Sequence, residues 1–236
     1  GLVIDDVPSG TVSSYPSALL NIESFTVKAG SQATDYGRNA PGGVIDIKTR
    51  TPGATHQGNV LLDYGSAKYS ALQASFDGPL NDKIGYSASV GLTEHEGYIE
   101  NTFRKRTADD RRSVAGRGAL YWKAADQLQV RFGLTMENTS DDATRLTSLF
   151  SRNPFEVASD LNGETKVERL QLSLQAKKTF TWGSLTATTS QQQWDLDPSV
   201  TDLDLSPLPL AFSNVKQSEK FWTQEFRFES TPGAQR

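Results

Sequence analysis

Few residues of this chain have the types and spacing that catalysis or metal binding requires. The two histidines are His56 and His95, and only His95 has acidic neighbours, in the run Glu94-His95-Glu96. Three successive residues of an extended chain point in alternating directions, so we interpret this run as a solvated loop edge rather than a metal site. Asp195 and Asp197 are spaced like paired carboxylates for acid–base catalysis, but nothing around them indicates a glycosidase.

The composition argues against several other classes of site. Cysteine is absent, which excludes disulfides, thiol nucleophiles and thiolate metal sites. The step Gly42-Gly43 lacks the lysine and the helix of a phosphate-binding loop. A net charge of -4 without an extended basic face argues against a nucleic-acid partner. The sequence therefore predicts no enzyme, no resident metal and no cofactor.

A basic loop is the best candidate for ligand binding. Arg104, Lys105 and Arg106 follow Phe103, and two aspartates and two arginines come after them at 109–112. The guanidinium groups of Arg104 and Arg106 could hold the carboxylates or catecholates of an anionic chelate, or the phosphates of lipopolysaccharide. The alternative is a solvated loop of mixed charge, and both interpretations stay open.

The elements around these residues alternate between apolar and polar side chains. Every second residue is apolar in the segments 84–93, 128–137 and 169–177. Such alternation is typical of strands with one apolar and one polar face. We expect eight strands, at about 57–66, 68–78, 83–96, 112–123, 127–138, 167–180, 184–194 and 219–229.

The connections between these strands favour a transmembrane barrel. Three of them are long, at 97–111, 139–166 and 195–218, and short turns lie between them. Transmembrane barrels have short turns at one end and longer loops at the other, whereas a soluble β-sandwich requires no such alternation. The mean hydropathy of -0.49 does not oppose this, because spanning strands are only ~10 residues long and half polar.

The polar face carries charges that belong in a water-lined lumen or against a plug. We therefore expect Leu172 and Phe132 to point to lipid, and their neighbours Gln171 and Arg131 to point to the lumen. The other polar-face residues that support this orientation are Arg117, Glu137, Arg169, Gln175 and Lys177.

The segment before the strands carries a different pattern. Strands are predicted at 22–28 and 44–49, with a turn region of glycines and one proline between them. The blocks Tyr36-Gly37-Arg38-Asn39 and Gly42 to Ile47 resemble, in this order, the end of the plug domain of TonB-dependent outer-membrane receptors. Residues 28–32 depart from the Arg-Gly-Pro-Gln-Gly-like turn of that family.

This resemblance implies an all-β fold with a small α/β plug portion. Residues 1–52 would be the C-terminal part of the plug, and residues 53–236 the first eight or so strands of a large antiparallel transmembrane β-barrel. Plugged outer-membrane barrels have about 22 strands, so we expect a fragment cut at both ends with roughly a third of the barrel.

The resemblance also implies a function in the bacterial outer membrane. A receptor of this family imports a bulky, scarce nutrient, most often an iron–siderophore chelate. Its partners would be that small-molecule ligand, outer-membrane lipid and lipopolysaccharide, and the TonB complex through a TonB box upstream of Gly1. Tyr36 would contact ligand at the plug apex or pack the turn, and Arg38 would pair with carboxylates of the barrel wall. The alternatives are a passive porin-like barrel and a soluble β-sandwich binding module.

Overall fold

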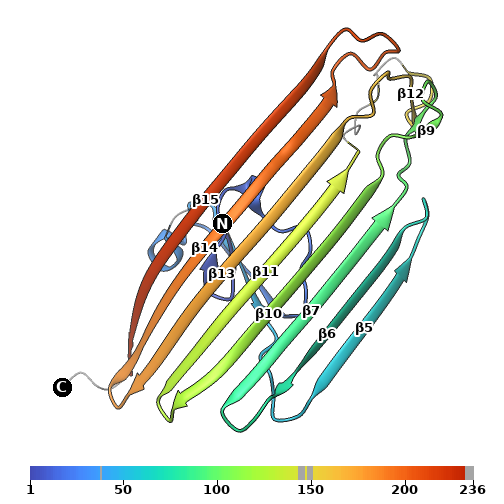
Figure 1. The fold of residues 1–236 in the computed structure, drawn as a ribbon. Coiled ribbons are helices and arrows are strands. Elements are labelled where there is room, and N and C mark those ends of the chain that lie inside the picture. The colour runs from blue at the N-terminus through green and yellow to red at the C-terminus, as the bar shows by residue number, and fades with distance from the viewer. Residues whose placement is uncertain (38, 143–146, 148–150, 232–236) are drawn as a thin grey trace.

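A computed structural model describes residues 1–37, 39–142, 147 and 151–231. The large sheet (Figure 1) has eight strands in the order β15-β14-β13-β11-β10-β7-β6-β5, so each strand lies beside its neighbours in the sequence. All eight predicted strands are therefore confirmed. They are β5 (Gln57–Tyr64), β6 (Ser70–Pro79), β7 (Ile84–His95), β10 (Arg111–Ala125), β11 (Leu128–Asp141), β13 (Glu164–Phe180), β14 (Gly183–Asp202) and β15 (Phe212–Ser230).

The last hairpin is longer than the sequence predicts. Strands β14 and β15 have 20 and 19 residues and stay paired up to Asp202 and Phe212. The prediction of a loop over 195–218 was therefore wrong for 195–202 and 212–218. Residues 214–218 are exposed on both faces of their strand. Polar residues then suit both faces, and the alternation that marks a half-buried strand is lost.

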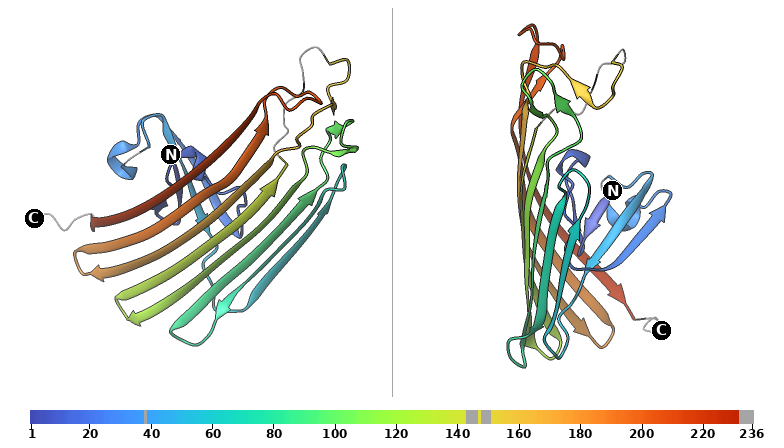
Figure 2. Two further views of the ribbon diagram at one scale, coloured as in Figure 1. Left: turned by 45° about the horizontal axis from the view of Figure 1, so that its top comes forward. Right: turned by 90° about the vertical axis from the view of Figure 1, so that its right-hand side faces the viewer.

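The two faces of the large sheet differ in polarity and in what they contact. One face exposes apolar side chains, among them Leu120 at 47%, Phe132 at 44% and Leu172 at 37%. The opposite face lies against a second, small sheet (Figure 2). A soluble β-sandwich would bury its apolar face between sheets, so this arrangement rules that alternative out.

The small sheet has four strands in the order β2-β1-β4-β3, and its two predicted strands, β3 and β4, are confirmed. The side chains of Leu2, Ile4 and Ile47 form its core. Two strands and a one-turn helix, α1, were not predicted from the sequence. The helix lies in the stretch predicted to be turns and is followed by Gly37, whose φ is 70°. The bounds are β1 (Leu2–Ile4), β2 (Val7–Pro8), β3 (Ile22–Ala29), α1 (Ala33–Tyr36) and β4 (Gly43–Thr49), with a 3-10 turn η1 at Val12–Ser14.

The connections between the strands differ in length at the two ends of the large sheet. The turns at 80–83, 126–127 and 181–182 lie at one end, which we call the short-turn end. The longer connections lie at the other, the long-loop end, where they form a three-stranded sheet (Figure 1) of β12 (Glu156–Val157), β8 (Glu100–Asn101) and β9 (Arg106–Thr107). Among the described residues, no helix has the length and apolar character that crossing a membrane requires.

Candidate functional site

A buried polar contact between the two sheets centres on Asp5, in the tight turn between β1 and β2. One of its carboxylate oxygens accepts hydrogen bonds from Arg117 and from Arg131, the latter at 2.6 Å. The same oxygen accepts a bond from the Thr49 hydroxyl at 2.8 Å, and the other accepts the Thr49 N–H at 2.8 Å. We call these four residues the Asp5 clasp. It joins β4 of the small sheet to β10 and β11 of the large one.

The clasp keeps Asp5 ionised although its side chain is only 8% exposed. Burial alone would raise the pKa of Asp5, but the guanidinium groups of Arg131 and Arg117 and the hydrogen bonds from Thr49 outweigh it. The pKa of this carboxyl therefore lies below its ordinary value of 3.8. A lowered folded-state pKa stabilises the contact at all pH values above 3.8, and this stabilisation is lost only as the pH falls through the folded-state pKa.

A second contact lies nearer the long-loop end. The Glu137 side chain of β11 is paired with Arg169 of β13 and is almost fully buried. Glu137 also accepts the Ser17 N–H at 3.1 Å, and Arg169 donates to the backbone carbonyls of Ser14 and Tyr15 at 2.8 and 2.6 Å. This Glu137–Arg169 pair therefore binds the main chain of the segment after η1.

Weaker contacts continue along the same face. Gln192 donates to the Pro8 carbonyl at 2.8 Å, and Gln175 donates to Asp6 at 3.3 Å. At β7 the contact is steric: a Cβ added at Gly91 would lie 2.8 Å from a methyl group of Leu20, so the Leu20 side chain would have to shift. The polar face of the large sheet is thus covered by the small sheet, as the sequence predicts for Arg117, Arg131, Glu137, Arg169 and Gln175.

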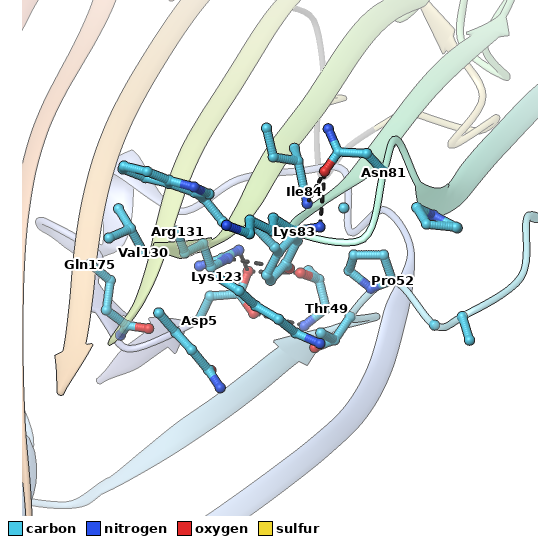
Figure 3. A pocket seen from close by; sticks show the side chains of 18 of the residues that line it. Asp5, Thr49, Pro52, Asn81, Lys83, Ile84, Lys123, Val130, Arg131 and Gln175 are labelled. Carbon is cyan, nitrogen blue, oxygen red and sulfur yellow. Dashed lines mark hydrogen bonds and ion pairs between the residues drawn. The ribbon is translucent and has the colours of Figure 1, made fainter. Parts of the chain in front are cut away.

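The interface between the small sheet and the large sheet opens into a cavity of about 840 Å³ at the short-turn end. The small sheet contributes Asp5 and Lys48 to its wall, the segment 51–54 contributes a second wall, and the large sheet contributes Lys123 and Arg131. Figure 3 shows Asp5 and Arg131 side by side, with Lys123, Thr49 and Pro52 around them. Farther from this end, the gap between the sheets beside Arg117 and Glu137 encloses only about 20 Å³.

Solved structures with this arrangement are outer-membrane receptors. The ferric yersiniabactin uptake receptor from Yersinia pestis superposes on 98% of the chain with a TM-score of 0.81 and 21% sequence identity. The pyoverdine receptor from Pseudomonas aeruginosa superposes on 95% with a TM-score of 0.73 and 16% identity. A ferric enterobactin receptor from Pseudomonas aeruginosa superposes on 95% of the chain with a TM-score of 0.68 and 17% sequence identity. The chain has the fold of TonB-dependent outer-membrane receptors.

A curated TonB-dependent receptor also matches in sequence. The pesticin receptor of Yersinia pestis is 30% identical over 93 residues, which are 39% of this chain. The chain spans 14% of that protein and between 35% and 37% of the three solved receptors. No family model matches the chain. The named relatives are receptors rather than enzymes, in agreement with the sequence analysis.

Arg38 is the residue predicted to join the plug to the barrel wall, and it lies outside the described residues. Its pairing with carboxylates of the large sheet stays a prediction. The described contact has the opposite polarity, because the small sheet supplies the carboxylate of Asp5 and the large sheet supplies Arg117 and Arg131. Asp5 was missed because its partners lie 112 and 126 residues away in the sequence.

The predicted ligand residues are not brought together in the receptor fold. The Tyr36 hydroxyl accepts a hydrogen bond from Lys28 at 2.5 Å and donates one to Asp46 at 3.0 Å. The adjacent Asp35 carbonyl accepts a bond from Arg227, near the short-turn end of β15. Arg104 and Arg106 lie at the long-loop end instead. The ligand-binding role of all three residues stays a prediction.

Both arginines of the basic loop already have partners in neighbouring loops. Arg104 donates to the Asp160 carbonyl at 2.8 Å, and Arg106 donates to the Asp142 carboxylate at 2.8 Å. Asn101 lies beneath them, fully buried, and bonds the Ser159 carbonyl and the Asn162 side chain at 2.8 and 2.7 Å. These bonds join the connection 96–110 to Asp142 and to residues 159–162, and together they form a loop unit at the long-loop end of the large sheet.

Asp142 makes this loop unit sensitive to pH. Burial and the neighbouring Asp110 carboxyl raise the pKa of Asp142 to about 6, although Arg106 and Asn162 oppose the shift. The folded loops therefore hold a proton that the unfolded loops release between pH 3.8 and about 6. The stability of the unit is highest below this window and falls as the pH rises through it.

We expect Asp142→Asn to remove this dependence. At pH 7.5 the amides of residues 97–110 should exchange hydrogen more slowly in the variant than in the wild type, and at pH 5 the two should be alike. Hydrogen exchange measured by mass spectrometry, corrected for intrinsic rates, tests this. Asp160→Asn is the control, because this residue joins the unit through its backbone. Equal differences between variant and wild type at both pH values would refute the assignment.

Proposed function

We propose that the chain belongs to an energy-coupled receptor in the bacterial outer membrane that imports an iron–siderophore chelate. Residues 1–52 form the C-terminal part of its plug, and residues 53–236 form the first strands of its barrel. The solved relatives include an uptake receptor for ferric yersiniabactin and a receptor for ferric enterobactin, which supports this ligand class.

The observation that carries the proposal is the covered polar face of the large sheet. A passive porin conducts solutes along such a face, so its lumen must stay open. Here buried ion pairs of Asp5 and of Glu137 hold the small sheet against that face. Free diffusion is then blocked, and an external source of energy has to move the plug. The TonB complex, acting through a TonB box, is the partner that would supply it.

The long-loop side is where we place ligand capture. Val12, in the turn η1, is 77% exposed and lies next to the segment that the Glu137–Arg169 pair holds. Arg104 and Arg106 stand on the same side, where their exposed guanidinium groups could bind an anionic group. The exposed apolar face of the large sheet would contact outer-membrane lipid and lipopolysaccharide.

Uptake of iron by cells tests the proposal. The full-length receptor would be expressed in a strain without its own siderophore receptors and supplied with ⁵⁵Fe complexed to yersiniabactin, enterobactin or pyoverdine. We expect saturable uptake of at least one chelate that stops when a protonophore collapses the proton gradient. Binding at the cell surface should persist under those conditions. Unsaturable, protonophore-resistant entry would instead indicate a porin.

A further inference from the structure

The place of ligand capture has a floor and one wall whose charges can be compared. We call it the capture chamber: the space between η1 and the long-loop end, on the polar face of β13, β14 and β15, which rise past the small sheet (Figure 2). Its floor is formed by Gly10, Thr11 and the turn η1, where Val12 is 77% exposed. None of the residues 10–14 has a charged side chain.

Two hydrogen bonds to this floor identify the face of the wall that looks into the chamber. Thr11 donates to Glu219 of β15 at 3.1 Å, and Arg169 of β13 donates to a backbone carbonyl of η1 at 2.8 Å. Because the side chains of a strand alternate between its faces, residues two and four positions farther along lie on the chamber side as well. A hydrogen bond of 3.4 Å between Thr165 of β13 and Ser199 of β14 confirms that these two neighbours share a face.

Beyond these contacts, the described part of this wall presents uncharged side chains to the chamber. They are apolar or carry hydroxyl or amide groups: Thr165 and Val167 on β13, Leu196 and Ser199 on β14, and Val215 and Gln217 on β15. The same stretches place charge on the outer face, where Lys166 pairs with Glu164 at 2.6 Å and Lys216 pairs with Asp197 at 2.8 Å. Charge on this wall is thus segregated to the outside of the sheet.

The charges that do face the chamber are balanced or acidic. Arg169 is buried against Glu137, and Arg111 faces Asp141 at 3.5 Å. Glu219 adds a carboxylate at the edge of the floor. The basic loop does not reverse this balance, because the connection between β7 and β10 has three basic and four acidic side chains. The described part of the chamber therefore offers a ligand no net positive charge.

We propose that the imported chelate carries no net negative charge, as in the iron(III) complex of three hydroxamates, and that the chamber discriminates against tris-catecholates. Three hydroxamate groups neutralise iron(III), whereas three catecholates leave the complex with a threefold negative charge. Proteins hold such anions with arginine and lysine, and a surface without net positive charge does not concentrate them. Hydroxyl and amide groups set among apolar side chains suit a neutral ligand, which they orient by hydrogen bonds. This inference rests on the proposed function and narrows its ligand class.

Equilibrium binding to cells that express the full-length receptor tests the ligand class. The probes, labelled with ⁵⁵Fe, are the tris-hydroxamates ferrichrome and ferrioxamine E and the ferric complexes of enterobactin, yersiniabactin and pyoverdine. Electrophoresis at the pH of the assay sorts them by net charge, and a protonophore restricts the measurement to binding. We expect the most tightly bound chelate to have no net negative charge and ferric enterobactin, a tris-catecholate, to bind at least about tenfold more weakly.

A lysine on the chamber wall should weaken this preference. Gln217→Lys places an ammonium group on the chamber face of β15, so the ratio of the two dissociation constants should fall at least about threefold. Asn214→Lys is the matched control, because it adds the same charge on the outer face of the same strand and should leave the ratio unchanged. If Gln217→Lys does not assemble, Thr165→Lys on β13 replaces it.

The outcomes separate this inference from the proposed function. Tightest binding of an anionic chelate by the wild type, together with its energy-dependent uptake, would overturn the charge preference and leave the proposed function standing. An unchanged ratio in the lysine variant of the chamber wall would also overturn the inference, because the wall would then not meet the ligand. Absence of saturable binding and uptake for all of the chelates would instead contradict the proposed function.

Discussion

Replacing Asp5 with lysine should detach the small sheet from the large one and make the outer membrane leak. The change leaves Arg117 and Arg131 buried without a counter-ion and adds a third positive charge beside them. Breaking a buried ion pair by removing one partner typically costs ~3–5 kcal/mol. Cells that express the full-length variant should become sensitive to vancomycin, and the unfolding temperature of the purified receptor should fall by several degrees.

Two controls isolate the role of the clasp. Asp82→Lys makes the same charge change at an exposed residue of the neighbouring cavity wall, so it should leave vancomycin resistance unchanged. Asp5→Asn keeps the size of the side chain and part of its hydrogen bonding, so its effect should be intermediate. Wild-type resistance and an unchanged unfolding temperature in Asp5→Lys would mean that the clasp does not hold the sheets together.

The second large effect concerns the apolar face of the barrel strands. Leu172→Arg places a charge on a face that we assign to lipid, where an arginine near the bilayer midplane costs ~2–4 kcal/mol. Assembly of the full-length receptor, followed by heat-modifiable migration on gels, should fall sharply. Gln171→Glu adds a charge one residue away on the opposite face, on the same side of the strand as Arg169, and should assemble normally. Equal assembly of the two variants would contradict the assigned orientation.

The large sheet could be predicted because lipid and a polar lumen impose opposite demands on alternate residues. Leu172 and Gln171 differ in polarity for this reason. The strand 184–194 had the weakest signal of the eight, because residues 186–193 are polar on both faces. The alternation failed beyond Trp194 on β14 and before Glu219 on β15, where the strands continue although the sequence no longer alternates clearly. On β15, residues 214–218 are exposed on both faces, and such a strand leaves no periodic signal in the sequence.

Of the contact between the two sheets, the side supplied by the large sheet could be predicted and the side supplied by the small sheet could not. Arg117 and Arg131 on a polar face signalled that the small sheet or water must neutralise them, since buried charges need partners. Nothing local marked Asp5 as that partner, because Asp5-Asp6 before Val7-Pro8 has the composition of an ordinary turn. The strands β1 and β2, of three and two residues, are also too short for a periodic pattern to emerge.

The central claim is that the polar face of the large sheet holds a plug while its apolar face meets lipid. Spin labels at positions 171 and 172 of the full-length receptor in bilayers test it most directly. We predict that the label at 172 is accessible to oxygen and shielded from a water-soluble nickel reagent, and that the label at 171 is less accessible to oxygen. A label at 172 that is shielded from oxygen and nickel alike would lie in a dry protein core and would contradict the account.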